Sequence, residues 1–191
     1  MNKSPFKSIL STAIYISTIC GLGYFAAIIF LNVLGLSMTD AVNWVYRICI
    51  IIAVIWSIIY HRIKYSNLGF LKAFNIGLLT SFFLGLYMSL SMFIFHKFLS
   101  PDYNKNFESY YRQKRSEQMY QTQLDKLIDK NGENYKLTSA DSLVVEKGLN
   151  LHIKNAHYFF TTEGAVWITF IFSLIWGLAV SSTVAFMAKK K

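Results

Sequence analysis

Acidic residues are scarce in this sequence and absent from its longest apolar stretches. The 191 residues include 10 Asp and Glu against 19 Lys and Arg, and charged residues make up 15% of the chain, compared with roughly 25% in an ordinary soluble domain. Asp40 is the only acid outside the segment 97–163. A carrier of protons or cations inside a membrane needs a carboxylate there. The sequence therefore argues against a multidrug exporter of the small four-span class.

The motifs of catalysis and metal binding are missing as well. The sequence contains no HExxH, GxSxG, GK[ST] or CxxC pattern, and His152 and His157 are five residues apart rather than the four of a helical zinc pair. Asp125, Asp129 and Glu133 are spaced like a carboxylate cluster, but lysines alternate with them as on a solvated helix face. We therefore expect no enzyme, no cofactor and no metal site.

Cysteine is nearly absent. Cys20 and Cys49 both lie in apolar runs and form no redox or metal-binding spacing. Ile19 stands before Cys20, where lipoprotein processing needs a small residue, and the apolar run continues without a cleavage site. We therefore interpret the first run as a membrane span and both cysteines as buried small hydrophobic residues.

The net charge of +9 does not indicate a nucleic-acid surface. Within 97–163 the basic residues are nearly balanced by acidic ones. The basic residues elsewhere flank apolar runs, with Arg47 inside a run as the exception: Lys3, Lys7, Arg62, Lys64, Lys72, Lys189, Lys190 and Lys191. This placement is typical of membrane topology signals, so we expect no nucleic-acid partner.

Long apolar runs are what the sequence does contain, and 54% of its residues are hydrophobic. The runs cover about 8–36, 41–60, 71–95 and 164–188, and about 20 residues suffice to cross the hydrocarbon as a helix. The sequence predicts an all-α polytopic membrane protein with four transmembrane helices. Residues 1–96 would hold helices 1–3, residues 97–163 a helical extracytoplasmic segment, and residues 164–191 helix 4 with a basic tail.

The short loops predict the orientation. The loop between the first two runs carries Asp40 and no basic residue, whereas basic residues precede the first run and follow the second and the fourth. Cytoplasmic loops carry the excess of Lys and Arg, and long loops are translocated largely regardless of charge. We expect a multi-pass protein of the inner (cytoplasmic) membrane, with both termini cytoplasmic and 97–163 extracytoplasmic.

The segment 97–163 is patterned as two helices. Ser100 and Pro101 suit an N-cap and a first helical residue, and Gly132 is expected to end that helix. Thr138 and Asp141 have the spacing of a capping box that opens a second helix.

An aromatic and basic stretch, "FESYYRQKR", lies in the first of these helices. We consider Tyr110, Tyr111, Arg112 and Arg115 as candidate contacts with a protein partner or with the outer leaflet. The alternative, that the aromatic residues cover the ends of the spans, stays open.

Small residues recur at every fourth position of the third run: Ala73, Gly77, Ser81, Gly85 and Ser89. The fourth run repeats the pattern with Ser173, Gly177 and Ser181. Small residues at this spacing let two helices approach closely. We predict that these two spans pack against each other through a small-residue seam, which is not a ligand groove.

Arg47 is the sharpest candidate for a functional contact. It lies roughly 9 Å inside the second run at 1.5 Å per residue. One interpretation is an interfacial arginine satisfied by lipid phosphate or by helix carbonyls. The other is a functional contact with a lipid headgroup or a partner subunit, with Lys72 or Arg62 as further phosphate ligands.

One stretch, from Leu68 to Leu124, carries a distinctive series of residues: Gly69, Phe70, Ala73, Phe74 and Gly77, then Ser100-Pro101-Asp102, then Gln113, Glu117, Gln118 and Met119. It resembles a domain-of-unknown-function family of small bacterial four-span membrane proteins. In that family "sFgqAFk-G" opens the third span, and an aromatic-rich exit, "NPD" and a charged, Gln- and Met-rich helix follow. The region 131–160 departs from the family by being longer and less acidic. The resemblance implies four spans in a bacterial inner membrane and brings no known activity.

These observations favour a non-enzymatic membrane protein. We expect an accessory or scaffolding subunit of a bacterial envelope complex, in contact with membrane lipids and with other membrane or envelope proteins, or with copies of itself. The alternative is a lipid- or solute-handling protein that binds or presents a lipid-linked phosphate through Arg47.

Overall fold

Regular structure in this protein is helical throughout the residues described. The computed structural model describes residues 5–36, 40–65, 68–131 and 138–189. These residues form six α-helices, one π-helical turn and one 3₁₀ turn, joined by short connections, and no strand occurs among them. The predicted all-α fold is confirmed.

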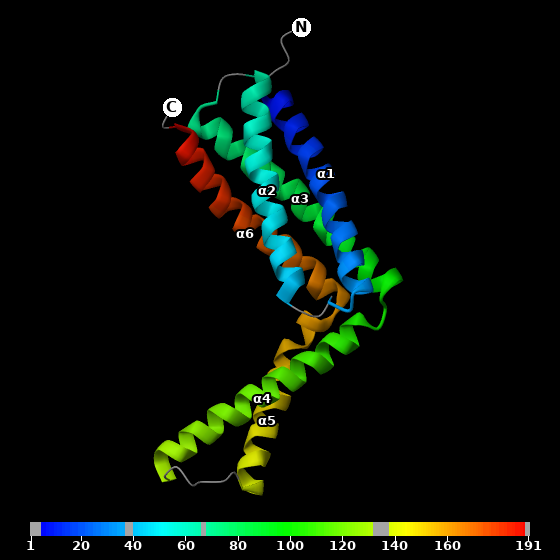
Figure 1. The fold of residues 1–191 in the computed structure, drawn as a ribbon, viewed down its shortest axis with the longest axis vertical. Helices are drawn as coiled ribbons and strands as arrows, with labels where there is room; N and C mark the ends of the chain where they lie inside the picture. The colour runs from blue at the N-terminus through cyan, green and yellow to red at the C-terminus, as the bar shows by residue number, and fades with distance from the viewer. Residues whose placement is uncertain (1–4, 37–39, 66–67, 132–137, 190–191) are drawn as a thin grey trace.

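Four of the helices are long and apolar enough to cross a membrane: α1 (Pro5–Val33), α2 (Asp40–Tyr65), α3 (Phe70–Ile94) and α6 (Thr162–Lys189). They form one group, in which α1 and α3 run in one direction and α2 and α6 in the other (Figure 1). The start of α1 and the end of α6 therefore lie at the same end of the group. The predicted multi-pass membrane architecture is confirmed.

The first span ends before its apolar run does. Gly35 adopts φ +71°, and its N–H bonds to the carbonyl of Asn32 at 3.0 Å, while the N–H of Leu36 bonds to the carbonyl of Leu31 at 2.8 Å. This pair of bonds around a left-handed glycine is a Schellman motif, which ends a helix by satisfying its last carbonyls. The helix therefore stops at Val33 and not at the predicted residue 36.

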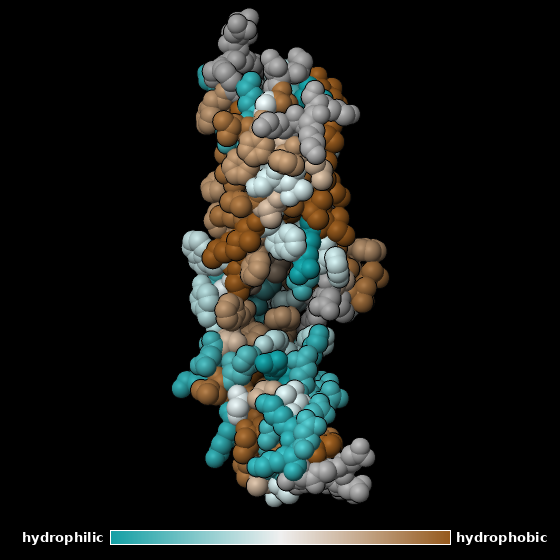
Figure 2. All heavy atoms as spheres, turned by 90° about the vertical axis from the view of Figure 1, so that its left-hand side faces the viewer, coloured by the Kyte–Doolittle hydropathy of each residue, from teal (hydrophilic) through white to brown (hydrophobic). Residues whose placement is uncertain are grey.

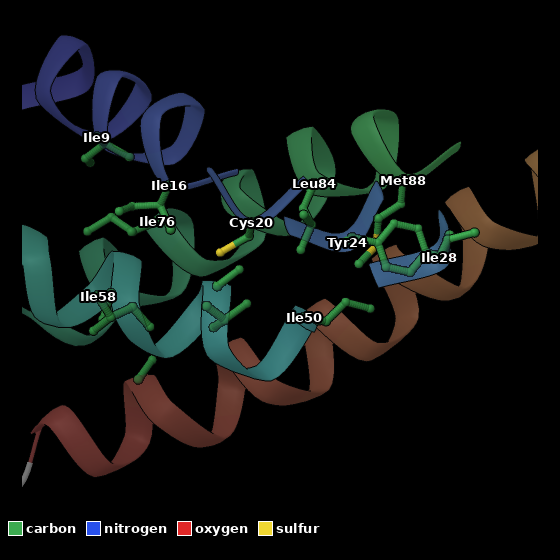
Figure 3. Packing of buried hydrophobic residues seen from close by; sticks show 14 of the residues in the cluster. Ile9, Ile16, Cys20, Tyr24, Ile28, Ile50, Ile58, Ile76, Leu84 and Met88 are labelled. Atoms are coloured by element: carbon green, nitrogen blue, oxygen red, sulfur yellow. The ribbon is translucent and has the colours of Figure 1, made fainter. Parts of the chain in front are cut away.

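Helix α3 lies at the centre of the group and contacts α1, α2 and α6. Its side chains Ile76, Leu84 and Met88 are fully buried, as are Ile16 of α1 and Ile50 of α2, and Figure 3 shows how they meet between the helices. Many large apolar side chains stay exposed on the outside of the group, among them Leu22, Phe30, Ile52, Ile175 and Phe186. On the face that Figure 2 draws, hydrophobic side chains form a belt over the four-helix group, as expected of side chains that face lipid.

The third span ends in a π-helical turn, Phe95–Leu99. The N–H of Ser100 bonds to the carbonyl of Phe95 at 2.8 Å, and the N–H of Tyr103 to the carbonyl of Ser100 at 3.0 Å. Pro101 and Asp102 consequently lie in a turn, and the next helix begins at Tyr103. The prediction that Pro101 is the first helical residue is wrong. Ser100 is bonded through its N–H to the π-helical turn and through its carbonyl to Tyr103, so the chain turns at Pro101 and Asp102 before the helix starts.

Helices α4 (Tyr103–Asn131) and α5 (Ser139–Ala156) pack side by side as a hairpin. The hairpin extends beyond the end of the four-helix group, along the long axis of the molecule (Figure 1), and its surface is largely hydrophilic in Figure 2. Leu149, Ile153 and Phe160 are buried within it.

The predicted capping box at the start of α5 is confirmed. The N–H of Asp141 donates to Thr138 Oγ1 at 3.3 Å, and the N–H of Thr138 donates to Asp141 Oδ2 at 2.9 Å. These reciprocal bonds satisfy backbone donors that a helix N-terminus leaves free. Helix α4 ends at Asn131, and the predicted stop at Gly132 lies outside the described residues.

Aromatic rings join the hairpin to the four-helix group. The rings of Phe95 and Tyr103 lie 5.4 Å apart, those of Tyr103 and Phe107 are 5.9 Å apart, and those of Phe107 and Phe160 are 6.0 Å apart. Burial in this cluster raises the pKa of the Tyr103 hydroxyl to about 12. The chain thus keeps a continuous packed core from the end of α3 into the hairpin.

Candidate functional site

The small residues of α3 and α6 meet one another in antiparallel register. A Cβ added to Gly77 would lie 2.8 Å from the Cβ of Ser181. A Cβ added to Gly177 would overlap the side chain of Ser81. Each glycine thus faces a serine of the other helix.

The same register continues toward the hairpin end. A Cβ added to Gly85 would lie 3.0 Å from the Cβ of Ser173, and the Ser89 hydroxyl donates to the carbonyl of Val166 at 3.0 Å. Ala73 begins the series and is fully buried. The structure therefore sets six residues of the predicted seam against one another in three glycine–serine pairs, bonds Ser89 to α6 and buries Ala73.

The seam leaves no room for a ligand. Ser81 donates to the carbonyl of Gly77 at 2.9 Å, and Ser173 donates to that of Thr169 at 2.8 Å, each within its own helix. The Ser81 side chain occupies the space opposite Gly177, and that of Ser173 the space opposite Gly85. This arrangement allows the backbones of α3 and α6 to approach closely, because interfaces between membrane helices favour small side chains.

Arg47 lies on α2, about 10 Å along the helix from its first residue at 1.5 Å per residue. Its Cζ is 5.5 Å from the centroid of the Trp44 ring and 5.4 Å from that of Trp176 on α6. Each such contact is worth about 0.5 to 2 kcal/mol, against about 2.5 to 3.5 kcal/mol for a cation at the bilayer centre. The tryptophans therefore offset part of the cost of placing a charge in this apolar helix.

A cavity of about 260 Å³ lies beside Arg47, and residues of all four long helices line it. The residues that carry polar atoms into its wall are Arg47 and Asn43 of α2, Tyr24 of α1, Tyr46 of α2, and Thr169 and Trp176 of α6. Figure 2 shows a hollow between the hydrophobic belt and the hydrophilic hairpin.

Tyr46 fixes one wall of this cavity. Its hydroxyl donates to the carbonyl of Thr169 at 3.0 Å and lies 3.0 Å from Ser173 Oγ. Its ring contacts that of Tyr24, with centroids 6.3 Å apart. These contacts hold α2 to both α1 and α6, so the cavity is a preformed feature of the packed helices.

The structure does not bring Lys72 to Arg47. Lys72 is exposed in the first turn of α3, at the opposite end of the group from the start of α2 (Figure 1). Arg62 lies in the last turn of α2, also at that end. Arg47 therefore does not share a single phosphate with Lys72 or Arg62, because the helices place them at opposite ends of the group.

Some side chains of the aromatic and basic stretch of α4 are partly buried within the hairpin, and others are exposed. Tyr111 is half-buried: its hydroxyl lies 2.9 Å from His152 Nε2 of α5, and its ring contacts Phe160. Tyr110 is exposed. Arg112 is exposed and donates to the Asn150 side chain of α5 at 2.9 Å.

Arg115 is only partly exposed, and its guanidinium donates to Gln118 Oε1 at 3.2 Å. Together with Tyr111 it contributes to the packing of the hairpin. Tyr110 and Arg112 are the members of the predicted set that face solvent most openly. Within the described part of the chain, no three His, Cys, Asp or Glu side chains are placed to hold a metal ion.

One exposed face of α5 escaped the sequence reasoning. Its members share one side of the helix and are all exposed: Leu143, Val144, Lys147, Leu151 and Lys154. We call this face the α5 stripe. The spacing of Val144, Lys147, Leu151 and Lys154 at i, i+3, i+7 and i+10 was a signal that periodicity offers, but periodicity alone does not show which side of a helix is buried.

Comparison with known families decides the relationship. A family model described as "Protein of unknown function (DUF4199)" matches residues 11–190. The chain belongs to this family. The match begins within α1 and extends past the end of α6, which confirms the resemblance seen in the residues around the third span.

The DUF4199 family carries no assigned activity in its description. No curated protein and no solved structure gives a significant match to the chain. The function of this DUF4199 member must therefore be argued from the seam, the Arg47 cavity and the hairpin themselves.

Proposed function

We propose that this protein is a non-enzymatic accessory subunit of a complex in the bacterial inner membrane, and that its hairpin binds another protein through the α5 stripe. The observation that carries the proposal is the exposure of three large apolar side chains on one face of α5. Leu143, Val144 and Leu151 are 56%, 61% and 61% exposed. A partner that covers them would gain the free energy of burying apolar surface.

The position of the stripe favours a protein over lipid as the covering surface. Leu143 and Val144 lie in the first turns of α5, about 20 Å from the end of that helix at 1.5 Å per residue. The end of α5 leads to α6, and the start of α5 is the far tip of the hairpin (Figure 1). A bilayer around the four-helix group would lie well away from these side chains.

Charge indicates the chemistry of the partner. Lys147 and Lys154 alternate with Val144 and Leu151 along the stripe, and Arg112 of α4 bonds to Asn150 beside it. A second copy would present the same positive charges and be repelled. We therefore propose a partner helix that carries acidic and apolar residues, bound in the manner of a helix on an apolar face.

The basic residues at the end of the four-helix group away from the hairpin support an orientation of the protein in the membrane. Lys7, Arg62, Lys64 and Lys72 lie there, in helices whose ends point away from the hairpin. Positive residues mark the cytoplasmic side. We propose that the termini are cytoplasmic and that the hairpin, with its partner, is extracytoplasmic.

A photo-crosslinking amino acid at Val144 tests the proposal in native membranes. We expect one discrete adduct with a second polypeptide, and we expect it to disappear when Leu151→Asp is added. Lys147→Glu with Lys154→Glu should weaken it in the same way, because both charges of the stripe are reversed. The same crosslinker at Thr122, which is exposed on α4, is the matched control and should give no such adduct.

Two results would contradict the proposal. An adduct that survives both sets of substitutions would show that the partner does not use the stripe. An adduct between two copies of this chain would show that the stripe serves self-association and not the binding of a different subunit.

A further inference from the structure

Arg47 is positively charged and has no counter-charge among the described side chains. It forms no ion pair or hydrogen bond with any described residue, and its recorded contacts are the two tryptophan rings at 5.5 and 5.4 Å. A guanidinium presents five N–H donors in a planar fork that suits phosphate oxygens. The side chain therefore has unused capacity to donate hydrogen bonds to an anion.

The cavity beside Arg47 has room for such an anion. Its volume of about 260 Å³ is several times the roughly 30 Å³ that a water molecule occupies in the liquid. Asn43 adds an amide to the wall, while Tyr46 is held in place by its bond to Thr169. Tyr46 and Thr169 bond to each other, and Arg47 and Asn43 are the exposed polar side chains of the wall, so these two are the groups that would meet a ligand first.

The surroundings of the cavity favour a ligand with an apolar tail. Phe172 and Trp176 of α6 line it, and Phe172 is 49% exposed on the lipid-facing side. Trp44 beside Arg47 is 60% exposed. A small hydrophilic anion would leave these side chains uncovered, whereas the acyl chains of a lipid would cover them.

Depth in the membrane agrees with a headgroup. Arg47 lies about 10 Å along α2 from its start at 1.5 Å per residue, which is about two thirds of the way to the middle of a hydrocarbon layer about 30 Å thick. Long cationic side chains at this depth reach toward the interface. The Arg47 side chain, extended toward the hairpin end, can thus bring its guanidinium toward the lipid phosphates of that leaflet.

We infer that the cavity between α2 and α6 binds the phosphate of an anionic phospholipid, with Arg47 as its main ligand, Asn43 as a second donor and the acyl chains along Phe172 and Trp176. This site is separate from the α5 stripe and does not depend on a protein partner. A soluble phosphate offers the same oxygen atoms to Arg47 but no chains for the aromatic side chains.

Lipid titration of the protein purified in mild detergent tests the inference. Native mass spectrometry would count bound dioleoyl-phosphatidylglycerol against the zwitterionic dioleoyl-phosphatidylcholine. We expect one tight site for the anionic lipid, and we expect its affinity to fall about tenfold or more in Arg47→Gln, since a charge-assisted bidentate contact is lost. Arg47→Lys keeps the charge without the planar fork and should lie between the two.

Arg62→Gln is the matched control, because Arg62 is an exposed arginine of the same helix at the opposite end. It should bind the anionic lipid as tightly as the wild-type protein. Thermal unfolding supplies a second readout: the anionic lipid should raise the Tm of the wild-type protein and leave that of Arg47→Gln nearly unchanged. Removing a membrane-embedded charge is not expected to prevent folding.

Equal binding of phosphatidylglycerol by the wild-type protein and Arg47→Gln would overturn the inference, as would equal loss in Arg62→Gln. A parallel titration with inorganic phosphate distinguishes the two sources of the ligand. Binding of phosphate alone, lost in Arg47→Gln and unmatched by the lipid, would overturn the assignment to a lipid.

Discussion

At the scale of single residues, the absence of a side chain at Gly177 determines how closely α6 approaches α3. The Cα of Ser81 would be 3.5 Å from a Cβ at this position, and the Ser81 side chain would overlap it. The sequence singled out the spacing of small residues, and the structure shows which serine stands opposite each glycine. The reciprocal order of glycine and serine is what makes the two helices interlock.

Gly177→Ala is the mildest test of this contact. Alanine normally stabilises a helix interior by about 1 kcal/mol relative to glycine, but here the added methyl group overlaps Ser81 and the expected result is destabilisation by about 1 to 3 kcal/mol. Gly177→Leu should separate the helices more strongly. The free energy of unfolding, measured by chemical denaturation in micelles, provides the readout.

Gly23 is the control for this substitution, because a Cβ added there meets nothing within 4 Å. Gly23→Ala should be neutral or slightly stabilising. If Gly177→Ala is as stable as Gly23→Ala, the close approach of α3 and α6 is not what holds them together.

At the scale of secondary-structure elements, local signals in the sequence predicted where some helices start but not where others end. The Thr138–Asp141 capping box opens α5 as predicted, because it involves side chains and backbone only three residues apart. The start of α4 was predicted two residues early, because the π-helical turn before it depends on how α3 meets the hairpin. Aromatic packing around Tyr103 is a tertiary contact that no local rule contains.

The hairpin should behave as a folding unit with its own small core. Ile153 is 5% exposed within it, whereas Leu151, two residues earlier, is 61% exposed. Ile153→Ala should lower the stability of α4 and α5 by about 2 to 4 kcal/mol, and Leu151→Ala should change it by about 0.5 kcal/mol or less. Hydrogen exchange of the backbone amides of α4 and α5 measures both. Equal exchange rates in the two variants would show that Ile153 does not stabilise the hairpin.

At the scale of the whole molecule, the four long helices and the hairpin divide the chain into an apolar part and a hydrophilic part (Figure 2). Arg47 lies near the start of α2, at the hairpin end of the group, and Lys72 lies in the first turn of α3, at the other end (Figure 1). The two surfaces for which we propose ligands therefore lie apart from the basic residues that we propose to mark the cytoplasmic side.

The orientation that we propose is testable by cysteine labelling. Glu117 is exposed on α4 and Lys72 is exposed in the first turn of α3. In intact cells a membrane-impermeant maleimide should label Glu117→Cys directly and Lys72→Cys only after permeabilisation. The native Cys20 and Cys49 lie within helices that span the apolar part, and the unsubstituted protein corrects for any labelling of them. The reverse pattern would invert the topology.

The number and position of the spans, the helical character of the hairpin and the importance of the small residues follow from sequence alone. The reason is that they depend on composition, hydrophobic runs and periodicity within one segment. Arg47 was also recognisable from sequence, because a cation in an apolar run is costly wherever it lies.

Tertiary structure alone decided what surrounds these residues. Trp176 meets Arg47 from a helix far away in the chain, Lys72 is carried to the opposite end, and packing of α4 on one side of α5 leaves Leu151 exposed. Each of these outcomes depends on which faces of separate helices meet. That choice is a property of the whole set of packing contacts, so it is absent from any single stretch of the sequence.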